Sequence, residues 1–521
     1  MYINAQAAWQ RGPVFVRLSG RWGTGACKSD VVVERALPVG FQFGVATAGF
    51  QIEGGYNGPG NEPRNNWYGW ESEGRVEPSG IALDFWNDYE RQLDLVADMG
   101  CDSFRLSVEW ARCEPAEGRY DDDAFAQYGA ILDACHARGL EPLVTLHHFT
   151  HPWWLGEDFW LDDGSAERFA GWAAAAAERL GPRCHNWVTI NEPNILALSS
   201  RVLGAFPPGR TGDLRGFVRV LDNLGAAHVA AYGALRDRSQ EANISWNPFS
   251  FSVYELDRLM TDVLLARSRG VARDDLDAHV AERRRTFYAS EAARGTGGTR
   301  RHPRFEELLR RFTNSFMSRV AKTKDGAGLG LGRTVAAAYE SPHERTLDVV
   351  QLDYYDPETA SHLQLPYRRT SGGRVPLPSR PLWEDPPNPA GLTAYSALNA
   401  EPGLGIWIVE NGLCNRVLRG RSYERPDGWT RDRYLRTNLG AVVAALDGGA
   451  PITGYWHWSL ADNYEWGSYE PRFGLFGVDR ERGCTWSDLD SMGVDAAGTY
   501  RELIKSLRAG DRSCFAPETQ P

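Results

Sequence analysis

The stretch SFRLSVEW, residues 103–110, alternates between apolar and polar side chains along its whole length. Because successive side chains of a strand point to opposite faces, its two kinds of residue lie on separate faces. The apolar face holds Phe104, Leu106, Val108 and Trp110, and the polar face holds Ser103, Arg105, Ser107 and Glu109. A solvent-facing strand of an antiparallel sheet has the same pattern, so this segment alone leaves both interpretations open.

Seven other segments resemble strands, and helical stretches with one apolar face follow most of them. In chain order, with the first stretch in its place, they are FQFGVATAGF, SFRLSVEW, EPLVTLHH, HNWVTINEP, NISWNPFSF, LDVVQLDYY, GIWIVENG and ITGYWHWSL. Near their C-terminal ends, several of these segments carry polar residues at alternate positions, which lie on the same face of a strand. A parallel barrel brings side chains together at that end. We therefore predict an α/β fold, a single (β/α)8 TIM barrel, with an open doubly wound sheet as the alternative.

The barrel is expected to span residues 39–508, preceded by a loose extension over 1–38 and followed by a short tail over 509–521. A long insertion, about residues 254–344, is expected between the fifth and sixth strands. From Glu282 to Arg319 the arginines far outnumber the acids, which is typical either of an anion or nucleic-acid patch or of a solvated helical segment. The solvated segment is the favoured interpretation.

Composition narrows the class of partner. The net charge of −11 argues against nucleic acid and against a membrane surface, because both favour a positive face. The eight cysteines have no metal-like spacing, which predicts free thiols in a reducing compartment. The sequence shows neither a secretion signal nor a membrane span, so we expect a cytoplasmic protein. The oligomeric state is not predicted.

Two glutamates end strand candidates in the same way. Glu192 follows the apolar run of HNWVTINEP, and Glu410 closes GIWIVENG, where the alternation puts it on the face of Ile406 and Ile408. Either one alone has an equally good interpretation as a solvated turn residue. Together they form a candidate pair, because glycoside hydrolysis needs one carboxyl group to protonate the leaving oxygen and another to meet positive charge at the sugar carbon.

Histidines could indicate a metal site instead. The segment HHFTH holds His147 and His148, but adjacent residues of a strand point to opposite faces, so the two do not form a ligand pair. A metal-dependent barrel hydrolase is therefore the weaker hypothesis. No metal and no cofactor are predicted.

Residues from about 39 to 508 resemble glycoside hydrolase family 1, the β-glucosidase family. The motifs that carry the resemblance are FQFGVATAGFQIEGG, FRLSVEWAR, TLHHF, WVTINEPN, WIVENG, GYWHWSLADNYEWG and RFGLFGVD, in the order of the family. Glu109 and HWSLADNYEW are more similar to the archaeal and bacterial branch than to the plant one. The resemblance implies a retaining β-glycosidase acting on a β-glucoside, β-galactoside or β-fucoside.

Carried over residue by residue, the resemblance implies that Glu192 is the acid/base and Glu410 the nucleophile. Arg105 and Tyr355 correspond to the family's groups beside the nucleophile, and Asn191 to the residue that binds the sugar 2-hydroxyl. The residues implied to hold the sugar are Gln51, His148, Trp458, Glu465 and Trp466. Trp458 would support the apolar face of the ring.

Some positions depart from the family pattern. Asp353 stands where the family usually has asparagine, and Phe149 replaces the usual tryptophan. An additional carboxylate near Glu410 either raises the pKa of the nucleophile or changes what the pocket accepts, and both alternatives are open. Two other functions also stay open: a transglycosidase that uses the same carboxylates, and a sugar-binding barrel without catalysis.

Overall fold

The computed structural model describes residues 36–290, 330–355, 369–370, 373–374, 382–384 and 387–515. Residues 1–35 of the predicted extension and residues 516–521 of the predicted tail lie outside the described residues, so both boundaries stay predictions.

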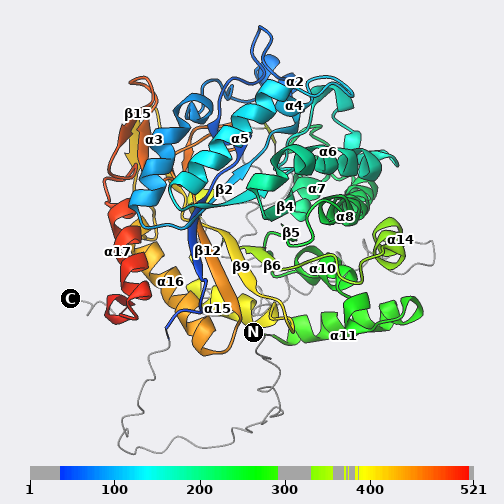
Figure 1. Ribbon diagram of the computed structural model, residues 1–521. Coiled ribbons are helices and arrows are strands. Elements are labelled where there is room, and N and C mark those ends of the chain that lie inside the picture. Colours follow the sequence, from blue (N-terminus) through cyan, green and yellow to red (C-terminus); the bar gives the residue numbers. More distant parts are fainter. Residues whose placement is uncertain are drawn as a thin grey trace, which may run out of the picture. The chain divides into compact units, whose positions relative to one another are not determined.

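Eight parallel strands form one sheet (Figure 1), in the order β5-β4-β3-β2-β1-β12-β9-β6. They are β1 Gln42–Ala46, β2 Ser103–Ser107, β3 Glu141–Thr145, β4 Asn186–Asn191, β5 Asn243–Asn247, β6 Val350–Asp353, β9 Ile406–Asn411 and β12 Ile452–Trp458. Each of the eight predicted segments contains one of these strands. The predicted (β/α)8 barrel is thus confirmed, and the open doubly wound alternative is wrong, because the two ends of the sheet meet.

The two ends of the sheet, β5 and β6, meet and nearly close the barrel. Phe249 and Asp353 form a parallel bridge across this seam. Along it the Asp353 amide donates to the Pro248 carbonyl at 3.3 Å, and the Ser250 amide donates to the Asp353 carbonyl at 3.1 Å. An open sheet would leave these backbone groups unpaired at two edges.

Helices surround the strands, as Figure 1 shows. They are α1 Gly49–Ile52, α2 Tyr68–Ser72, α3 Phe85–Asp98, α4 Trp110–Cys113, α5 Asp122–Ala137, α6 Ser165–Leu180, α7 Pro193–Arg201, α8 Leu214–Arg236, α9 Tyr254–Asp257, α10 Leu259–Leu264, α11 Leu276–Ala289, α14 Gly332–Glu340, α15 Pro389–Leu398, α16 Arg431–Asp447 and α17 Ala496–Arg508. Within the described ranges, none is both long enough and apolar enough to cross a bilayer.

Short strands lie beyond the barrel. They are β7 Arg369–Thr370, β8 Gly373–Arg374, β10 Asn415–Leu418, β11 Arg421–Tyr423, β13 Pro471–Arg472, β14 Gly477–Asp479 and β15 Thr485–Ser487. They pair as β11-β10-β13, β14-β15 and β7-β8. β10 and β11 come after β9 in the chain, and β13 comes after β12. This small sheet is therefore built from the connections that leave the C-terminal ends of two barrel strands.

The alternation predicted for residues 103–107 separates two packing environments. Phe104 and Leu106 pack in the large cluster beneath the helices, whereas Ser103 and Arg105 point into the barrel. A second cluster, here called the barrel-interior cluster, fills the inside; it comprises Ala46, Ala48, Leu143, Val188, Val349, Trp407, Val409, Cys414, Trp456, Trp458 and Phe473. A barrel of this size therefore has an interior packed with side chains and not an open pore.

Glycine makes room for one of the three tryptophans of that interior. The indole of Trp456 donates to Ser103 Oγ at 3.0 Å and lies against the backbone of Gly44. A Cβ added at Gly44 would lie 2.4 Å from Trp456 Cδ1, inside any possible contact distance. The ring can therefore occupy this part of the barrel only because the neighbouring strand carries no side chain there.

The segment between β5 and β6 contains α9, α10, α11 and α14, and its residues 291–329 lie outside the described ranges. In the described part of the Arg-rich stretch, two arginines contact carboxylates from other segments. Arg283 lies 3.1 Å from Asp262 and 3.0 Å from Glu401, and Arg284 lies 2.9 Å from Glu255. These contacts give both arginines a structural role in packing α11. That the whole segment is an insertion stays a prediction.

We expect Asp348 to stabilise the β5–β6 seam. Its carboxylate accepts from the Ile244 amide at 2.9 Å and from Tyr232 at 3.0 Å, and it pairs with Arg236. Asp348→Ala should lower the free energy of unfolding by about 2–4 kcal/mol, because it leaves a backbone donor and a largely buried guanidinium without their partner. Urea denaturation monitored by circular dichroism measures this. The exposed Asp237→Ala is the control and should change stability by less than about 0.5 kcal/mol.

Candidate active site

Glu192 occupies a strained position at the end of β4. It is the N-cap of α7, where Pro193 begins the helix, and its backbone is left-handed with φ 38° and ψ 61°. Its amide donates to the Asn247 carbonyl on β5 at 2.8 Å. A non-glycine residue in this conformation costs about 1–3 kcal/mol and is typical of functional sites. The turn directs the carboxyl group toward the barrel mouth instead of along the helix.

Glu410 reaches the barrel mouth through an irregularity in β9. Next to β6, Leu352 pairs with Ile408 while Asp353 pairs with Glu410, so β9 has one additional residue at this point. Ile406 and Ile408 pack outward in the large cluster. The prediction that Glu410 shares their face is therefore wrong: the bulge reverses the parity and turns the carboxylate inward.

Arg105 and Tyr355 hold the carboxylate of Glu410. Arg105 Nη1 lies 2.5 Å from Glu410 Oε1, and the Tyr355 hydroxyl donates to Oε2 at 2.8 Å. The guanidinium is fully buried and the carboxylate is 4% exposed. Charge-assisted hydrogen bonds are the stronger kind, and here both carboxylate oxygens have a donor. Both partners predicted from the sequence thus contact Glu410.

A network of amides connects this pair to the neighbouring strands. Arg105 Nη2 donates to Asn191 Oδ1 at 2.6 Å, and its Nε donates to Thr145 Oγ1 at 3.2 Å. Asn191 Oδ1 also accepts from Asn247 Nδ2 at 2.7 Å, and Asn191 Nδ2 lies 3.3 Å from His148 Nε2. Four strands are therefore tied through one guanidinium. The side-chain orientation of Asn191 is fixed from two sides.

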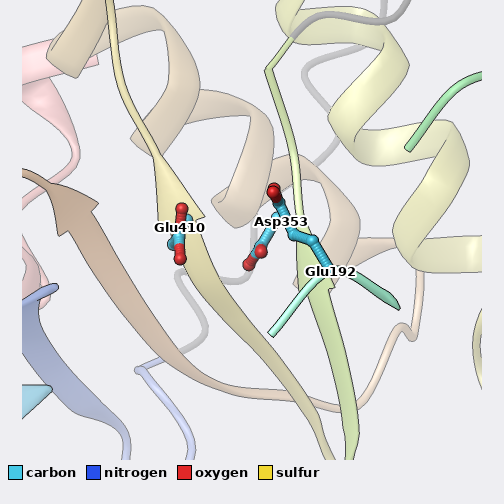
Figure 2. A group of neighbouring side chains, drawn as sticks. All are labelled: Glu192, Asp353 and Glu410. Atoms are coloured by element: carbon cyan, nitrogen blue, oxygen red, sulfur yellow. The ribbon is translucent and has the colours of Figure 1, made fainter. Parts of the chain in front are cut away.

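Three carboxyl groups converge at the barrel mouth (Figure 2). One oxygen each of Glu192, Asp353 and Glu410 lies within 4.8 Å of the other two. Burial raises the pKa of Glu192 well above its usual range, and the nearby Glu410 raises it further. Burial also raises the pKa of Glu410, but Arg105 and the Tyr355 hydroxyl oppose that rise. The negative charge is thus best stabilised on Glu410, and a proton is best retained on Glu192.

The residues predicted to hold a sugar surround the same mouth. Gln51 on α1 donates to Glu465 Oε2 at 3.2 Å, and the indole of Trp458 donates to Glu465 Oε1 at 3.1 Å. The ring of His148 stacks against both tryptophans, at 5.8 Å from Trp458 and 5.7 Å from Trp466. Glu465 and Trp466 are half-buried, so they lie on the accessible side of this group. All ten predicted site residues therefore lie in one contiguous constellation.

The sequence interpretation missed two contributors. Asn247 ends β5 and donates to Asn191 and to Asp353 Oδ2. Its signal was present, because the strand-like run NISWN ends in Asn247 as NWVTIN ends in Asn191. Trp383 packs against the barrel-interior cluster with the Arg416 guanidinium 4.9 Å above its ring, and no periodicity marks it.

The three clustered carboxyl groups are close enough together to ligate one cation. Among the described residues, this is the one cluster of three or more His, Cys, Asp or Glu side chains with that spacing. Both oxygens of Glu410, however, already accept from Arg105 and Tyr355. A cation would have to displace one of these donors and approach the guanidinium charge. We therefore treat the cluster as protonatable groups and do not assign metal ligands to it.

Comparison with known families agrees with this fold and geometry. The model of glycosyl hydrolase family 1 matches residues 33–506. The chain therefore belongs to glycosyl hydrolase family 1, a family of glycoside hydrolases.

Its relatives are β-glucosidases from plants and bacteria at similar identity. β-Glucosidase 6 of Oryza sativa subsp. japonica is 26% identical over 464 residues, covering 85% of this chain and 87% of the relative. β-Glucosidase A of Thermotoga maritima is 25% identical over 495 residues, covering 91% and 98%. A third relative, from the same rice, is named probable inactive β-glucosidase 14 and is 27% identical over 473 residues, covering 85% and 87%.

Solved structures share the fold. A Thermotoga maritima β-glucosidase in complex with methoxycarbonyl-substituted glucoimidazole superposes with a TM-score of 0.65 at 22% identity, covering 91% of this chain and 99% of that one. At this identity the likeness concerns the barrel and not the substrate.

Tyr355→Phe should test the electrostatic support of Glu410. The Tyr355 hydrogen bond lowers the pKa of Glu410, so its loss raises that pKa, and the acidic limb of kcat/KM for an aryl β-glucoside should move to higher pH. We expect kcat/KM at the optimum to fall about 10- to 100-fold, the effect of a hydrogen bond to a charge.

Tyr354→Phe is the matched control. The Tyr354 hydroxyl donates to the Asn388 carbonyl at 2.6 Å, away from the three carboxyl groups. The acidic limb of kcat/KM against pH for Tyr354→Phe should lie at the same pH as that of the wild type. A Tyr355→Phe limb that moved to lower pH, or did not move, would contradict the assigned contact.

Proposed function

We propose that this protein is a retaining β-glycosidase that hydrolyses O-linked β-glycosides through a covalent glycosyl-enzyme. One observation carries the proposal: an oxygen of Glu192 and an oxygen of Glu410 lie within 4.8 Å across the barrel mouth. Retaining enzymes hold their two carboxyl groups about 5–5.5 Å apart, whereas inverting enzymes need about 6.5–9.5 Å to admit a water. The separation favours direct attack of one carboxylate on the sugar.

Glu410 is proposed as the nucleophile because the site stabilises its charge. The guanidinium at 2.5 Å and the tyrosine hydroxyl at 2.8 Å both favour the ionised form. The carboxylate attacks the anomeric carbon and forms an ester as the glycosidic bond breaks. The 4% exposure of Glu410 keeps most of its shell dry, so these contacts act at low dielectric.

Glu192 is proposed as the acid and then the base. Its proton passes to the departing glycosidic oxygen while Glu410 forms the ester. Esterification removes the Glu410 charge, and with it one cause of the raised pKa of Glu192. The pKa of Glu192 therefore falls in the glycosyl-enzyme, and the resulting carboxylate takes a proton from the water that attacks the ester.

The remaining residues are proposed to hold the sugar. Gln51 and Glu465 form one polar edge through their 3.2 Å hydrogen bond, and His148 forms another beside Asn191. The rings of Trp458 and Trp466 supply an apolar surface for the sugar face. Burial raises the pKa of Glu465 to about 8, so below that pH this group can donate as well as accept hydrogen bonds. A β-glucoside, β-galactoside or β-fucoside fits these groups.

Two alternatives use the same barrel. A transglycosidase would transfer the sugar from Glu410 to an alcohol, and product analysis with an alcohol acceptor separates it from a hydrolase. A silent sugar-binding barrel is the second alternative, and one relative is itself named probable inactive β-glucosidase 14. Against silence, this chain carries both carboxyl groups and the two donors to Glu410.

The decisive experiment is a panel of nitrophenyl β-glucoside, β-galactoside and β-fucoside with wild type, Glu410→Ala and Glu192→Ala. Glu410→Ala should lose essentially all hydrolysis. Glu192→Ala should keep activity on these activated substrates, because their leaving groups need little protonation. Azide should accelerate Glu192→Ala and give the β-glycosyl azide, as expected when no general base is needed.

Nuclear magnetic resonance of the first sugar released by wild type provides the stereochemical check. The β-anomer should appear before mutarotation. Equal loss in the two variants, or an α-anomer as first product, would contradict the roles of Glu192 and Glu410.

A further inference from the structure

Asp353 is a third carboxyl group at the reacting centre, and neither acid/base nor nucleophilic chemistry requires it. It ends β6, is fully buried, and bridges to Phe249 across the barrel seam. Asn247 Nδ2 donates to its Oδ2. Its Oδ1 receives no hydrogen bond from an N–H or O–H group of the described residues. That oxygen is thus a buried polar atom without a donor, which is costly unless it carries a proton or meets one.

The groups that face Asp353 come from four elements. Glu192 at the start of α7 is in hydrogen-bonding contact with it, and Glu410 on β9 lies within 4.8 Å of both. Arg105 on β2 supplies positive charge, and Asn247 on β5 supplies a neutral donor. Figure 2 shows the Asp353 and Glu192 side chains beside each other, with Glu410 opposite.

Charge balance limits how many of these acids can be ionised. In the described part of the chain, the Arg105–Glu410 contact is the only ion pair that any of the three acids forms. One guanidinium balances one carboxylate, so with Glu410 ionised the other two acids are neutral in the free enzyme. If Glu192 and Asp353 were both ionised, two negative charges would lie in contact in a buried site. Their mutual repulsion opposes that state.

We propose that Asp353 keeps a proton through both half-reactions and donates it as a hydrogen bond to Glu192, so that it acts as a positioning residue for the acid/base. The inference rests on the proposed retaining mechanism and deepens it. Burial and the two neighbouring glutamates raise the pKa of Asp353 well above its usual range, which supports the neutral form.

Protons and charges balance in each step. In the free enzyme Glu410 is the carboxylate, and Glu192 and Asp353 are acids. Glycosylation moves the Glu192 proton to the leaving oxygen and converts the Glu410 carboxylate into an ester, so Glu192 becomes the single carboxylate beside a neutral Asp353. Hydrolysis of the ester returns a proton from water to Glu192 and restores the charge on Glu410. The cluster carries one negative charge against Arg105 throughout.

A carboxylic acid beside Glu192 has a specific effect on this cycle. The Asp353 hydroxyl stabilises the Glu192 carboxylate of the glycosyl-enzyme, which exists only after the first step. An ionised Asp353 would do the opposite, because it would hold the Glu192 proton more tightly and oppose acid catalysis. The two states of Asp353 therefore predict different spectra and different pH profiles.

The direct test is infrared difference spectroscopy on enzyme labelled with carbon-13 aspartate. The resting wild type should show the carbonyl band of a protonated aspartic acid that Asp353→Asn lacks and that the exposed control Asp237→Asn retains. The same band should persist after trapping with a 2-deoxy-2-fluoro-β-glucoside that esterifies Glu410. Equal spectra of wild type and Asp353→Asn would overturn the proposal, as would loss of the band on trapping.

Kinetics give an independent readout. Replacing a neutral acid by a neutral amide should leave the alkaline limb of kcat/KM within about 0.5 pH unit of wild type. If Asp353 were ionised, Asp353→Asn would remove a negative neighbour of Glu192, and the limb would move to lower pH by more than about one unit. A shift of that size would overturn the proposal. The resting-enzyme spectrum requires no turnover, so it can fail while glycosidase activity stands.

Asp353→Ala removes the donor altogether. With a phenyl β-glucoside, whose leaving group needs acid assistance, kcat/KM should fall about tenfold, because the Glu192 carboxylate that forms as the proton leaves has lost its donor. With a dinitrophenyl β-glucoside, which needs little acid assistance, kcat/KM should stay within about threefold of wild type. Asp353→Asn, whose amide can also donate, should restore the phenyl β-glucoside value to within about threefold of wild type. Equal kcat/KM for the phenyl β-glucoside in the alanine and asparagine variants would contradict a donor role. Should the alanine variant fail to fold, the spectrum and the asparagine pH profile still decide.

Discussion

The buried guanidinium of Arg105 is the constraint on which the rest of the site depends. It cannot lose its charge in a protein, so a buried position demands a permanent carboxylate partner. Glu410 at 2.5 Å is that partner, and the same guanidinium donates at 2.6 Å to Asn191. One rigid fork thus orients both the group proposed to attack the anomeric carbon and the amide proposed to bind the sugar 2-hydroxyl. Their relative position does not depend on a loop.

The same constraint determines which acids hold protons. Two unit charges within 4.8 Å of each other repel by ~3 kcal/mol or more at an effective dielectric of about 20. With Glu410 charged by its pairing to Arg105, that repulsion acts on both neighbours, and burial adds to it. An acid and a nucleophile made from the same residue type therefore differ in protonation because only one of them contacts the cation.

Much of this arrangement could be predicted from the sequence. Eight strand candidates and their polar C-terminal ends indicated the barrel, and the motifs located the ten proposed site residues that the structure brings together. The face of β9 on which Glu410 lies could not be predicted from the sequence. Side chains alternate between the two faces only in a regular strand, and the bulge in β9 depends on its pairing with β6. Asn247 was missed because its importance comes from contacts with residues 56 and 106 positions away.

The site also separates into two parts with different origins. The reacting groups and their partners sit on strand ends, which barrel packing holds in place, whereas Glu465 and Trp466 follow β12 in a longer connection. The tightest constraints therefore act on the charge arrangement, and the surrounding connections are free to differ among relatives at 25–27% identity. Asp353 belongs to the first part, on a strand end within the cluster. A substitution there is expected to change how protons are held at the reacting centre, because Asp353 lies apart from the connection that carries Glu465 and Trp466.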